Sequence, residues 1–224
     1  MYQGWPLTIN DMLSGGDGAY CFFDDDEPEL LITSVYYNKY YVWDNGNWSN
    51  YFDQWESGVF VNPADYNSET NTLYANAVMF SGNLMNHILR VKNVEESESG
   101  DFLPLTTGTA TWFSHVKYSP YSPADSDNLF LGTNSGRLYK VTNADTDPVA
   151  TEITGDDFPL GSISCIALGG SEDVIMVTFS NYGVSSIWQS TDGGETWAEK
   201  EGNLPDMPVR WAVYHPEGNN QALL

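Results

Sequence analysis

The residues that could carry chemistry are chiefly carboxylates. The 224-residue chain has 31 Asp and Glu against eight Lys and Arg, and two carboxylates a defined distance apart are what hydrolysis of a glycosidic bond requires. The sequence contains many pairs of carboxylates, and no spacing between them identifies a catalytic pair. The run Asp24-Asp25-Asp26-Glu27 has the oxygen ligands that suit Ca²⁺, but it lacks the spacing of a known calcium loop, so we interpret it as a solvated turn. His87, His115 and His215 are scattered and form no metal-ligand set, so no cofactor is expected.

Cys21 and Cys165, the two cysteines, lie far apart and in different predicted repeats. They show no metal-binding spacing, and the sequence does not determine whether they form a disulfide. We predict that both are buried apolar thiols.

The net charge of −23 excludes two classes of partner. It repels nucleic acids and anionic membranes, and the few basic residues form no stripe that would overcome this. No apolar stretch approaches the roughly 20 residues of a membrane helix, and the first residues lack the features of a signal peptide. Few Lys and abundant Asn, Asp, Thr, Ser, Tyr and Trp predict an extracellular or cell-surface protein whose signal peptide is not in this chain.

The elements that must position these residues are strands. Short runs rich in β-branched and aromatic residues, bounded by Gly, Pro, Asn and Asp, recur throughout, and no long segment shows a capped helical period. The fold is therefore predicted to be all-β. A strand, a polar turn and a second hydrophobic strand recur five times, at 19–24 with 29–34, 59–64 with 71–77, 115–120 with 128–133, 163–168 with 173–179, and 210–216 with 221–224.

The spacing of these repeats predicts a β-propeller. Leu31, Leu73, Phe130, Ile175 and Leu223 mark equivalent points that lie 42, 57, 45 and 48 residues apart, and four-stranded propeller blades run to roughly 40–50 residues. We expect antiparallel blades at 15–55, 56–108, 109–157, 158–205 and 206–224, the last one truncated. Four to five blades fall short of the roughly 6–8 of a closed ring of such repeats, so we expect a partial propeller and a fragment.

One motif is specific enough to indicate a family. Residues Ser190-Thr191-Asp192-Gly193-Gly194-Glu195-Thr196-Trp197 match Ser-x-Asp-x-Gly-x-Thr-Trp at all five fixed positions. This resembles the Asp-box of BNR-repeat propellers, the sortilin- and sialidase-like group. The resemblance implies a turn between the third and fourth strands of a blade, on the outer rim and remote from the ligand-binding mouth. Asp192 would then accept backbone N–H groups, Gly194 would take a positive φ, and Trp197 would pack against the sheet.

Two weaker resemblances extend the first. The stretch Trp43-Asp44-Asn45-Gly46-Asn47-Trp48 is similar to a degenerate Asp-box. Gly15-Gly16-Asp17-Gly18 resembles the start of a blade in secreted bacterial propellers of the Bacteroidetes type, and the turn at 215–220 resembles one that leads into a further blade.

Two enzyme families with similar propellers have characteristic catalytic or substrate-binding residues that are not found at the matching positions of this sequence. Sialidases clamp a carboxylate with three arginines, but Arg90, Arg137 and Arg210 stand outside that family's arginine motif. Xyloglucan-cleaving propellers resemble the first blade, yet the segment 33–38, where that family carries a catalytic Asp, has no acid.

An aromatic tract provides candidate ligand-stacking residues, namely Tyr36, Tyr37, Tyr40 and Trp43. These rings could stack on sugars, although half of a strand's residues face the sheet interior, so packing is the alternative interpretation.

The leading hypothesis is a non-catalytic propeller module that binds glycan or protein partners. The alternative is an Asp-box glycoside hydrolase, xyloglucanase- or sialidase-like, with catalytic residues partly in missing blades. A third hypothesis is an assembly or stability factor of the photosystem II type, although its arginine patch is not evident.

Overall fold

The computed structural model describes residues 14–54, 56–79, 81, 83–215 and 222–223. The first six residues, most of the predicted turn at 215–220, and Gln221 and Leu224 of the last predicted strand lie outside the described residues. Every regular element described is a strand, and no described helix is long and apolar enough to cross a membrane.

The strands form four four-stranded antiparallel sheets and one two-stranded sheet, and each sheet follows chain order. This confirms the predicted all-β fold and its propeller blades. The first sheet holds β1 (Cys21–Phe23), β2 (Leu31–Ser34), β3 (Asn38–Asp44) and β4 (Asn47–Gln54), and the second holds β5 (Ala64–Asn67), β6 (Thr72–Asn76), β7 (His87–Val91) and β8 (Asp101–Pro104). The third holds β9 (Phe113–Tyr118), β10 (Leu129–Thr133), β11 (Leu138–Thr142) and β12 (Val149–Glu152), and the fourth holds β13 (Ile163–Leu168), β14 (Ile175–Phe179), β15 (Ile187–Ser190) and β16 (Ala198–Glu199). The two-stranded sheet pairs β17 (Val213–Tyr214) with β18 (Ala222–Leu223).

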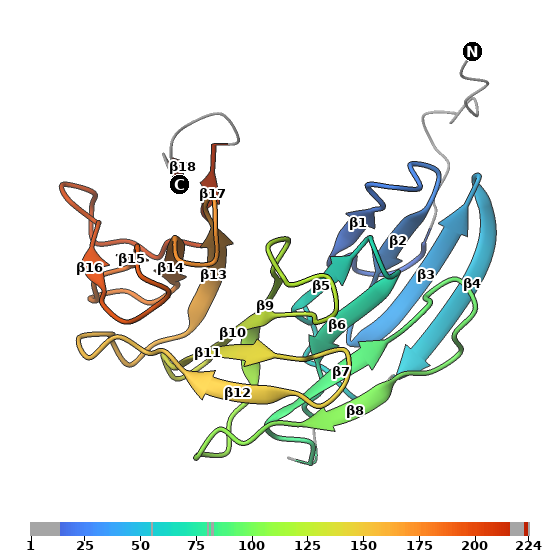
Figure 1. The fold of residues 1–224 in the computed structure, drawn as a ribbon, viewed down its shortest axis with the longest axis horizontal. Coiled ribbons are helices and arrows are strands. Elements are labelled where there is room, and N and C mark those ends of the chain that lie inside the picture. The colour runs from blue at the N-terminus through green and yellow to red at the C-terminus, as the bar shows by residue number, and fades with distance from the viewer. Residues whose placement is uncertain (1–13, 55, 80, 82, 216–221, 224) are drawn as a thin grey trace.

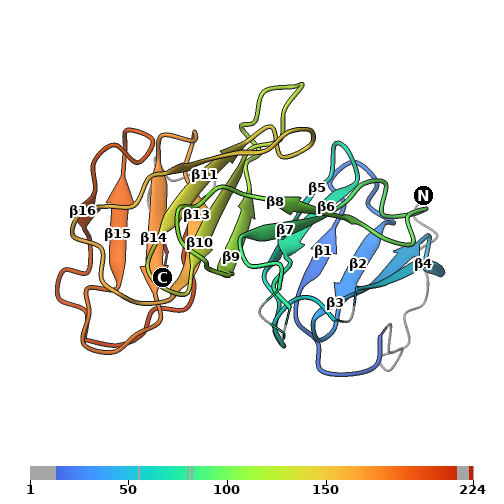
Figure 2. The same cartoon turned by 90° about the horizontal axis from the view of Figure 1, so that it is seen from below.

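The sheets are arranged as an arc (Figure 1). The first strand of each sheet, β1, β5, β9, β13 or β17, lies on the concave inner side, and the fourth strands lie outside. Seen from the side, the third and fourth sheets stand next to one another (Figure 2). Because each sheet is an up-and-down meander, its loops divide between two faces. We call "mouth face" the one with the β2–β3 loop and the β4–β5 connection, and "hairpin face" the one with the β1–β2 and β3–β4 turns.

Apolar side chains between neighbouring sheets hold the arc together. Leu30, Ile32 and Phe52 of the first sheet pack with Leu73 and Leu89 of the second in one buried cluster. Similar clusters join the second sheet to the third, the third to the fourth, and the fourth to β17 and β18. Each fully buried Leu, Ile or Phe contributes about 1.5–3 kcal/mol, so stability lies between blades as much as within them.

Hydroxyl groups add a repeated polar contact between blades. Ser114 Oγ, on β9, donates to the carbonyl of Ile163 at 2.7 Å, and Ser164 Oγ, on β13, donates to the carbonyl of Val209 at 2.6 Å. In each case the first strand of one blade is tied to the chain entering the next. These partly buried hydrogen bonds each add a modest contribution to the contact between blades.

The structure corrects two predictions. The segment 59–64 was predicted as a strand, but β5 begins only at Ala64, because Pro63 has no N–H to donate and Gly58 turns the chain with φ 89°. Cys165 is buried as predicted, whereas Cys21 is exposed. Cys21 lies on β1 next to Phe22, and Phe22 takes the inward position against the core cluster.

The substitution Gly132→Ala tests the packing between the third and fourth blades. A Cβ at this position would lie 2.4 Å from Ile163 Cγ2 and 2.8 Å from its Cβ, in the interface between the third and fourth sheets. We expect Gly132→Ala to lower the free energy of unfolding by about 1–3 kcal/mol through overpacking. Gly18→Ala is the control, because nothing lies within 4 Å of its Cβ position. Urea unfolding measures both, and equal stability of the two variants would contradict the packing.

Candidate functional site

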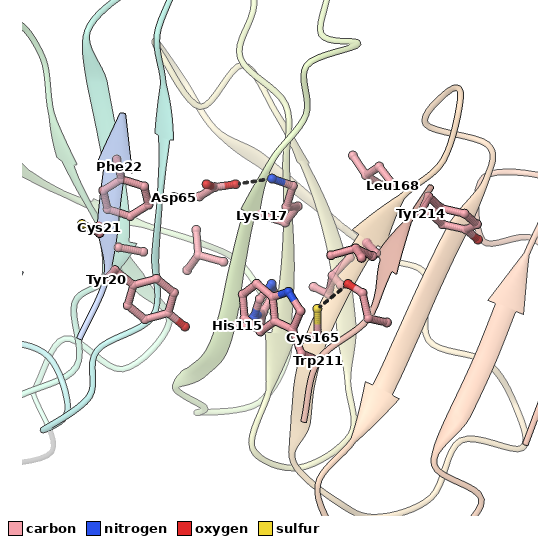
Figure 3. Close-up of a pocket in the computed structure, with 16 residues that line it drawn as sticks. Tyr20, Cys21, Phe22, Asp65, His115, Lys117, Cys165, Leu168, Trp211 and Tyr214 are labelled. Carbon is pink, nitrogen blue, oxygen red and sulfur yellow. Dashed lines mark hydrogen bonds and ion pairs between the residues drawn. The ribbon is translucent and has the colours of Figure 1, made fainter. Parts of the chain in front are cut away.

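A groove with a volume of about 420 Å³ lies on the inner side of the arc. We call it the inner groove. Its walls come from the first strands β1, β5, β9 and β13 and from the segment 211–214, so every blade contributes to it (Figure 3). This placement follows from the repeat, because the first strand of every meander faces the centre of the arc.

The charged groups of the groove neutralise one another. Asp65 Oδ2, on β5, accepts hydrogen bonds from Lys117 Nζ at 2.8 Å and from the backbone N–H of Tyr118 at 2.8 Å (Figure 3). Asp65 is the one carboxylate among the lining residues and Lys117 the one ammonium group. The groove is therefore close to electroneutral inside a strongly acidic chain.

His115 lies at the back of the groove and is 3% exposed. Burial lowers the pKa of its imidazole to about 4, so the ring is uncharged at neutral pH. Its Nδ1 has no hydrogen-bond partner. The ring meets the indole of Trp211 edge to face, with centroids 5.6 Å apart.

The Cys165 thiol and the Tyr20 hydroxyl in the groove are also uncharged at neutral pH. Burial raises the pKa of the Cys165 thiol to about 11, and its Sγ donates to the carbonyl of Ala212 at 3.4 Å. Burial likewise raises the pKa of Tyr20 to about 12. A thiol held in its protonated form is a poor nucleophile.

Aromatic rings give the groove surfaces for stacking. Trp211 is 51% exposed, and Tyr20 and Tyr214 also line the groove. Tyr214 Oη accepts a hydrogen bond from Gln189 Nε2 at 2.9 Å, which fixes its ring. A groove without net charge and with exposed aromatic faces favours binding of a neutral ligand.

The groove lacks the acid pair of a glycosidase, since Asp65 is its single carboxylate and is already paired. Glu95 is a carboxyl group with a raised pKa, caused by burial and by the nearby Glu27 and Asp44. Glu95 lies between β7 and β8, away from the lining residues.

Residues 190–197, which resemble an Asp-box, form a closed turn between β15 and β16. Asp192 accepts hydrogen bonds from the Thr196 N–H at 2.9 Å, the Thr196 hydroxyl at 2.5 Å and the Ser190 hydroxyl at 2.8 Å. These bonds lower the pKa of Asp192 to about 2. Gly194 has φ 93°, and a Cβ there would lie 2.9 Å from the Cβ of Ile153.

Trp197 fastens this turn to the neighbouring sheet. Its Nε1 donates to the carbonyl of Ile153 at 3.0 Å, and its ring packs on Phe158 with centroids 4.8 Å apart. Asp192 lies on the hairpin face, because it is in the β15–β16 turn. Trp211 of the groove lies toward the mouth face, because it precedes β17. The geometry gives Asp192 a folding role.

The candidate stacking residues do not form one platform. Tyr40 is fully buried against Phe52, with ring centroids 4.9 Å apart. Trp43 lies at the far end of β3, beside the Asn45-Gly46 turn of the degenerate motif, where both residues have positive φ. Tyr36 and Tyr37 remain together at the β2–β3 loop.

The acidic run at 24–27 is a turn of the hairpin face. Asp24 Oδ1 accepts the N–H groups of Asp26 and Glu27, and its Oδ2 accepts the hydroxyl of Tyr66 at 2.8 Å. Asp24 therefore links two blades. Within the described part of the chain, no three His, Cys, Asp or Glu side chains gather into a metal site.

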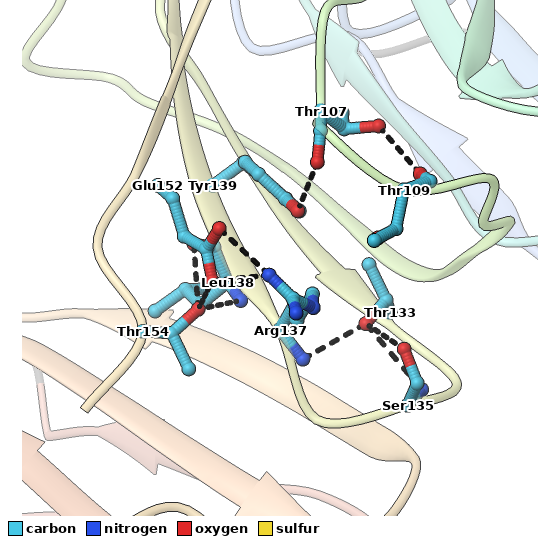
Figure 4. A network of polar contacts seen from close by, with 9 residues as sticks. All are labelled: Thr107, Thr109, Thr133, Ser135, Arg137, Leu138, Tyr139, Glu152 and Thr154. Atoms are coloured by element: carbon cyan, nitrogen blue, oxygen red, sulfur yellow. Dashed lines mark hydrogen bonds and ion pairs between the residues drawn. The ribbon is translucent and has the colours of Figure 1, made fainter. Parts of the chain in front are cut away.

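Two of the three arginines are bound to neighbours. Arg90 donates to the carbonyl of Ala144 at 3.0 Å and pairs with Asp101 at 3.1 Å. Arg137 contacts both carboxylate oxygens of Glu152, within a network of threonine hydroxyls at the edge of the third sheet (Figure 4). Neither lines the inner groove, so these two do not provide a carboxylate clamp there.

Sequence reasoning missed the groove. His115 was set aside as isolated, and Asp65, Lys117 and Trp211 were not singled out. The available signal was their position in the repeat, since Asp65, His115 and Lys117 lie on first strands and Trp211 lies just before one.

The fold and the groove define the chain as a module of the β-propeller class. No protein-family model matches the chain, and no curated protein matches it. Among solved structures, it is similar to YCF48 from Cyanidioschyzon merolae, with a TM-score of 0.59 and 15% identity over 87% of this chain and 62% of that one. It is also similar to a GH74 enzyme from Niastella koreensis, with a TM-score of 0.62 and 19% identity over 90% of this chain and 32% of that one.

Both similar structures are β-propeller proteins, and at these identities the likeness shows the fold alone. The chain spans less than two thirds of the length of either.

Asp192→Ala tests the turn between β15 and β16. We expect a lower melting temperature at neutral pH, because three hydrogen bonds to Asp192 are lost. The folded pKa lies below the ordinary value, so this contribution is complete above about pH 4 and disappears as the pH falls through about 2. Thermal unfolding between pH 7 and pH 2 should show the wild type and the variant converging, with exposed Asp157→Ala as the control. A gap that stays constant down to pH 2 would contradict this role.

His115→Gln tests the buried imidazole. In the wild type, the unfolded ring takes up a proton near its ordinary pKa and the folded ring does so only near pH 4. Stability is therefore complete above about pH 6.5 and falls as the pH drops toward 4, by on the order of 3 kcal/mol. Urea unfolding at pH 7, 5.5 and 4.5 should show that His115→Gln lacks this loss of stability at low pH. His87→Gln should retain it. Identical pH dependence of the wild type and His115→Gln would show that the ring is not buried.

Proposed function

We propose that this chain is a non-catalytic propeller module that binds a neutral glycan in the inner groove. The observation that carries the proposal is the pairing of Asp65 with Lys117, which leaves the groove without net charge and without a spare carboxylate. A hydrolase of the two-carboxylate kind needs one acid that can give up a proton and a second that acts as base or nucleophile.

The ring surfaces of Trp211, Tyr20 and Tyr214 support a glycan as ligand. Sugar rings present apolar C–H faces that stack on aromatic side chains, and their hydroxyl groups hydrogen-bond to polar neighbours. The groove combines such rings with the polar atoms of Asp65 and Lys117. An anionic polysaccharide is disfavoured by the charge of −23.

The proposal also places the protein outside the cell or on the surface of a bacterial cell. The support is compositional, because the chain has few Lys and many Asn, Asp, Thr, Ser, Tyr and Trp residues. A protein segment is the competing ligand, and a glycoside hydrolase is the competing activity.

Trp211→Ala tests the binding role of the groove. Isothermal titration with cellohexaose and mannohexaose, which are neutral, should show binding of at least one to the wild type. The variant should bind it about tenfold more weakly, because an exposed stacking ring is lost. Trp48→Ala is a matched control, since Trp48 is 62% exposed but lies on the hairpin face, and it should bind like the wild type.

Hydrolysis is measured in the same samples by chromatography of the products. No binding of either hexasaccharide, together with release of shorter sugars, would overturn the proposal in favour of a hydrolase. Equal binding by Trp211→Ala and the wild type would remove the inner groove as the site.

A further inference from the structure

Two loops of the mouth face bring three aromatic rings together outside the inner groove. Tyr36 and Tyr37 lie between β2 and β3, and Phe60 lies between β4 and β5. The rings of Tyr36 and Phe60 are nearly parallel, at 15° with centroids 6.1 Å apart, and Tyr37 stands edge-on to both, at 5.5 and 6.0 Å. We call these residues the loop aromatic cluster.

The backbone beneath the cluster is held firmly. The Tyr37 N–H donates to the Phe60 carbonyl at 3.1 Å, and the next N–H, of Asn38, donates to the Ser57 carbonyl at 3.1 Å. Below them the buried amides of Asn38, Asn62 and Asn76 bond to one another. The two loops are thereby joined through a polar network that is shielded from water, so the rings are positioned in advance of any ligand.

The backbone strain and the ring exposure of the loop aromatic cluster both lower the stability of the fold. Tyr37 has φ 62°, a left-handed conformation that is strained for a non-glycine residue. Phe60 is 51% exposed, and none of the three rings belongs to a buried core cluster. Tyr36 and Tyr37 are half-buried, so the cluster exposes one aromatic ring, that of Phe60, on a preorganised support. A strained backbone together with an exposed, preorganised ring is a feature of a binding site.

We propose that the loop aromatic cluster is a second subsite for a neutral sugar ring, which extends the glycan site of the inner groove toward the rim of the mouth face. The exposed ring of Phe60 provides a surface for the C–H face of a pyranose, and Tyr36, stacked on it, and Tyr37, edge-on to it, hold the ring in place. The proposal rests on the proposed function, because both sites are assigned to one elongated ligand.

Charge and chain direction support this occupant. Lys39, whose Nζ lies 5.2 Å from the centre of the Tyr36 ring, is paired with Asp53 at 3.2 Å, so its charge is already neutralised. The strongly acidic chain disfavours an anionic sugar. Phe60 comes four residues before β5, the strand that carries Asp65 of the groove, so a short segment of chain joins the cluster to the groove.

The experiment compares ligand length in the wild type and in Phe60→Ala. Titration calorimetry measures affinity for the trisaccharide and hexasaccharide of the neutral series that binds, cellotriose and cellohexaose or mannotriose and mannohexaose. Phe60→Ala should weaken hexasaccharide binding about tenfold and leave trisaccharide binding unchanged. Phe60→Tyr keeps a ring and should bind like the wild type.

Phe23→Ala is the matched control, because this Phe is 69% exposed and lies at the end of β1 on the hairpin face. It should not alter binding, and thermal unfolding should show that both alanine variants are folded.

Equal hexasaccharide affinity of Phe60→Ala and the wild type would overturn the second subsite while the glycan-binding function stands. Failure of the wild type to bind any of these sugars would overturn the proposed function and the subsite together. A loss in Phe60→Ala of binding to a hexaproline peptide, with hexasaccharide binding unchanged, would replace the sugar with a peptide.

Discussion

Packing between consecutive sheets is the constraint on which the rest of the structure depends. No four-stranded sheet can bury its apolar face alone, so Leu73 and Leu89 of the second blade complete the core of the first, and the same arrangement repeats along the arc. The serine bonds from Ser114 and Ser164 tie the first strands of the third and fourth blades to the chain entering the next blade. The inner groove exists because this packing brings the first strands of all blades to one edge.

The chemistry of the groove follows from its burial. Removal from water keeps His115 unprotonated and the thiol of Cys165 protonated, and it pairs the single carboxylate with the single ammonium group. The result is a groove without net charge and with exposed aromatic rings. Burial opposes protonation of the His115 imidazole and ionisation of the Cys165 thiol, and the carboxylate of Asp65 is already held in its ion pair with Lys117.

The all-β fold could be predicted from the sequence because the repeat spacing and the turn residues are local signals. The Asp192 turn is equally local, since Ser190 and Thr196 bond to it within a few residues. The site could not be predicted in this way, because Asp65 and Lys117 are 52 residues apart and meet only through blade packing. The aromatic tract was predicted in part: Tyr36 and Tyr37 lie together, but Tyr40 faces the core and Phe60 arrives from another loop.

The position of the ligand is the central claim, and a proton–nitrogen correlation spectrum of the tryptophan indoles tests it most directly. The protein would be titrated with cellohexaose and mannohexaose while the signals of Trp211, in the groove, and Trp197, in the Asp192 turn, are followed. We expect one of these sugars to shift the Trp211 indole signal and to leave that of Trp197 in place. A shift of Trp197 with Trp211 unchanged, or no shift of either with both sugars, would contradict it.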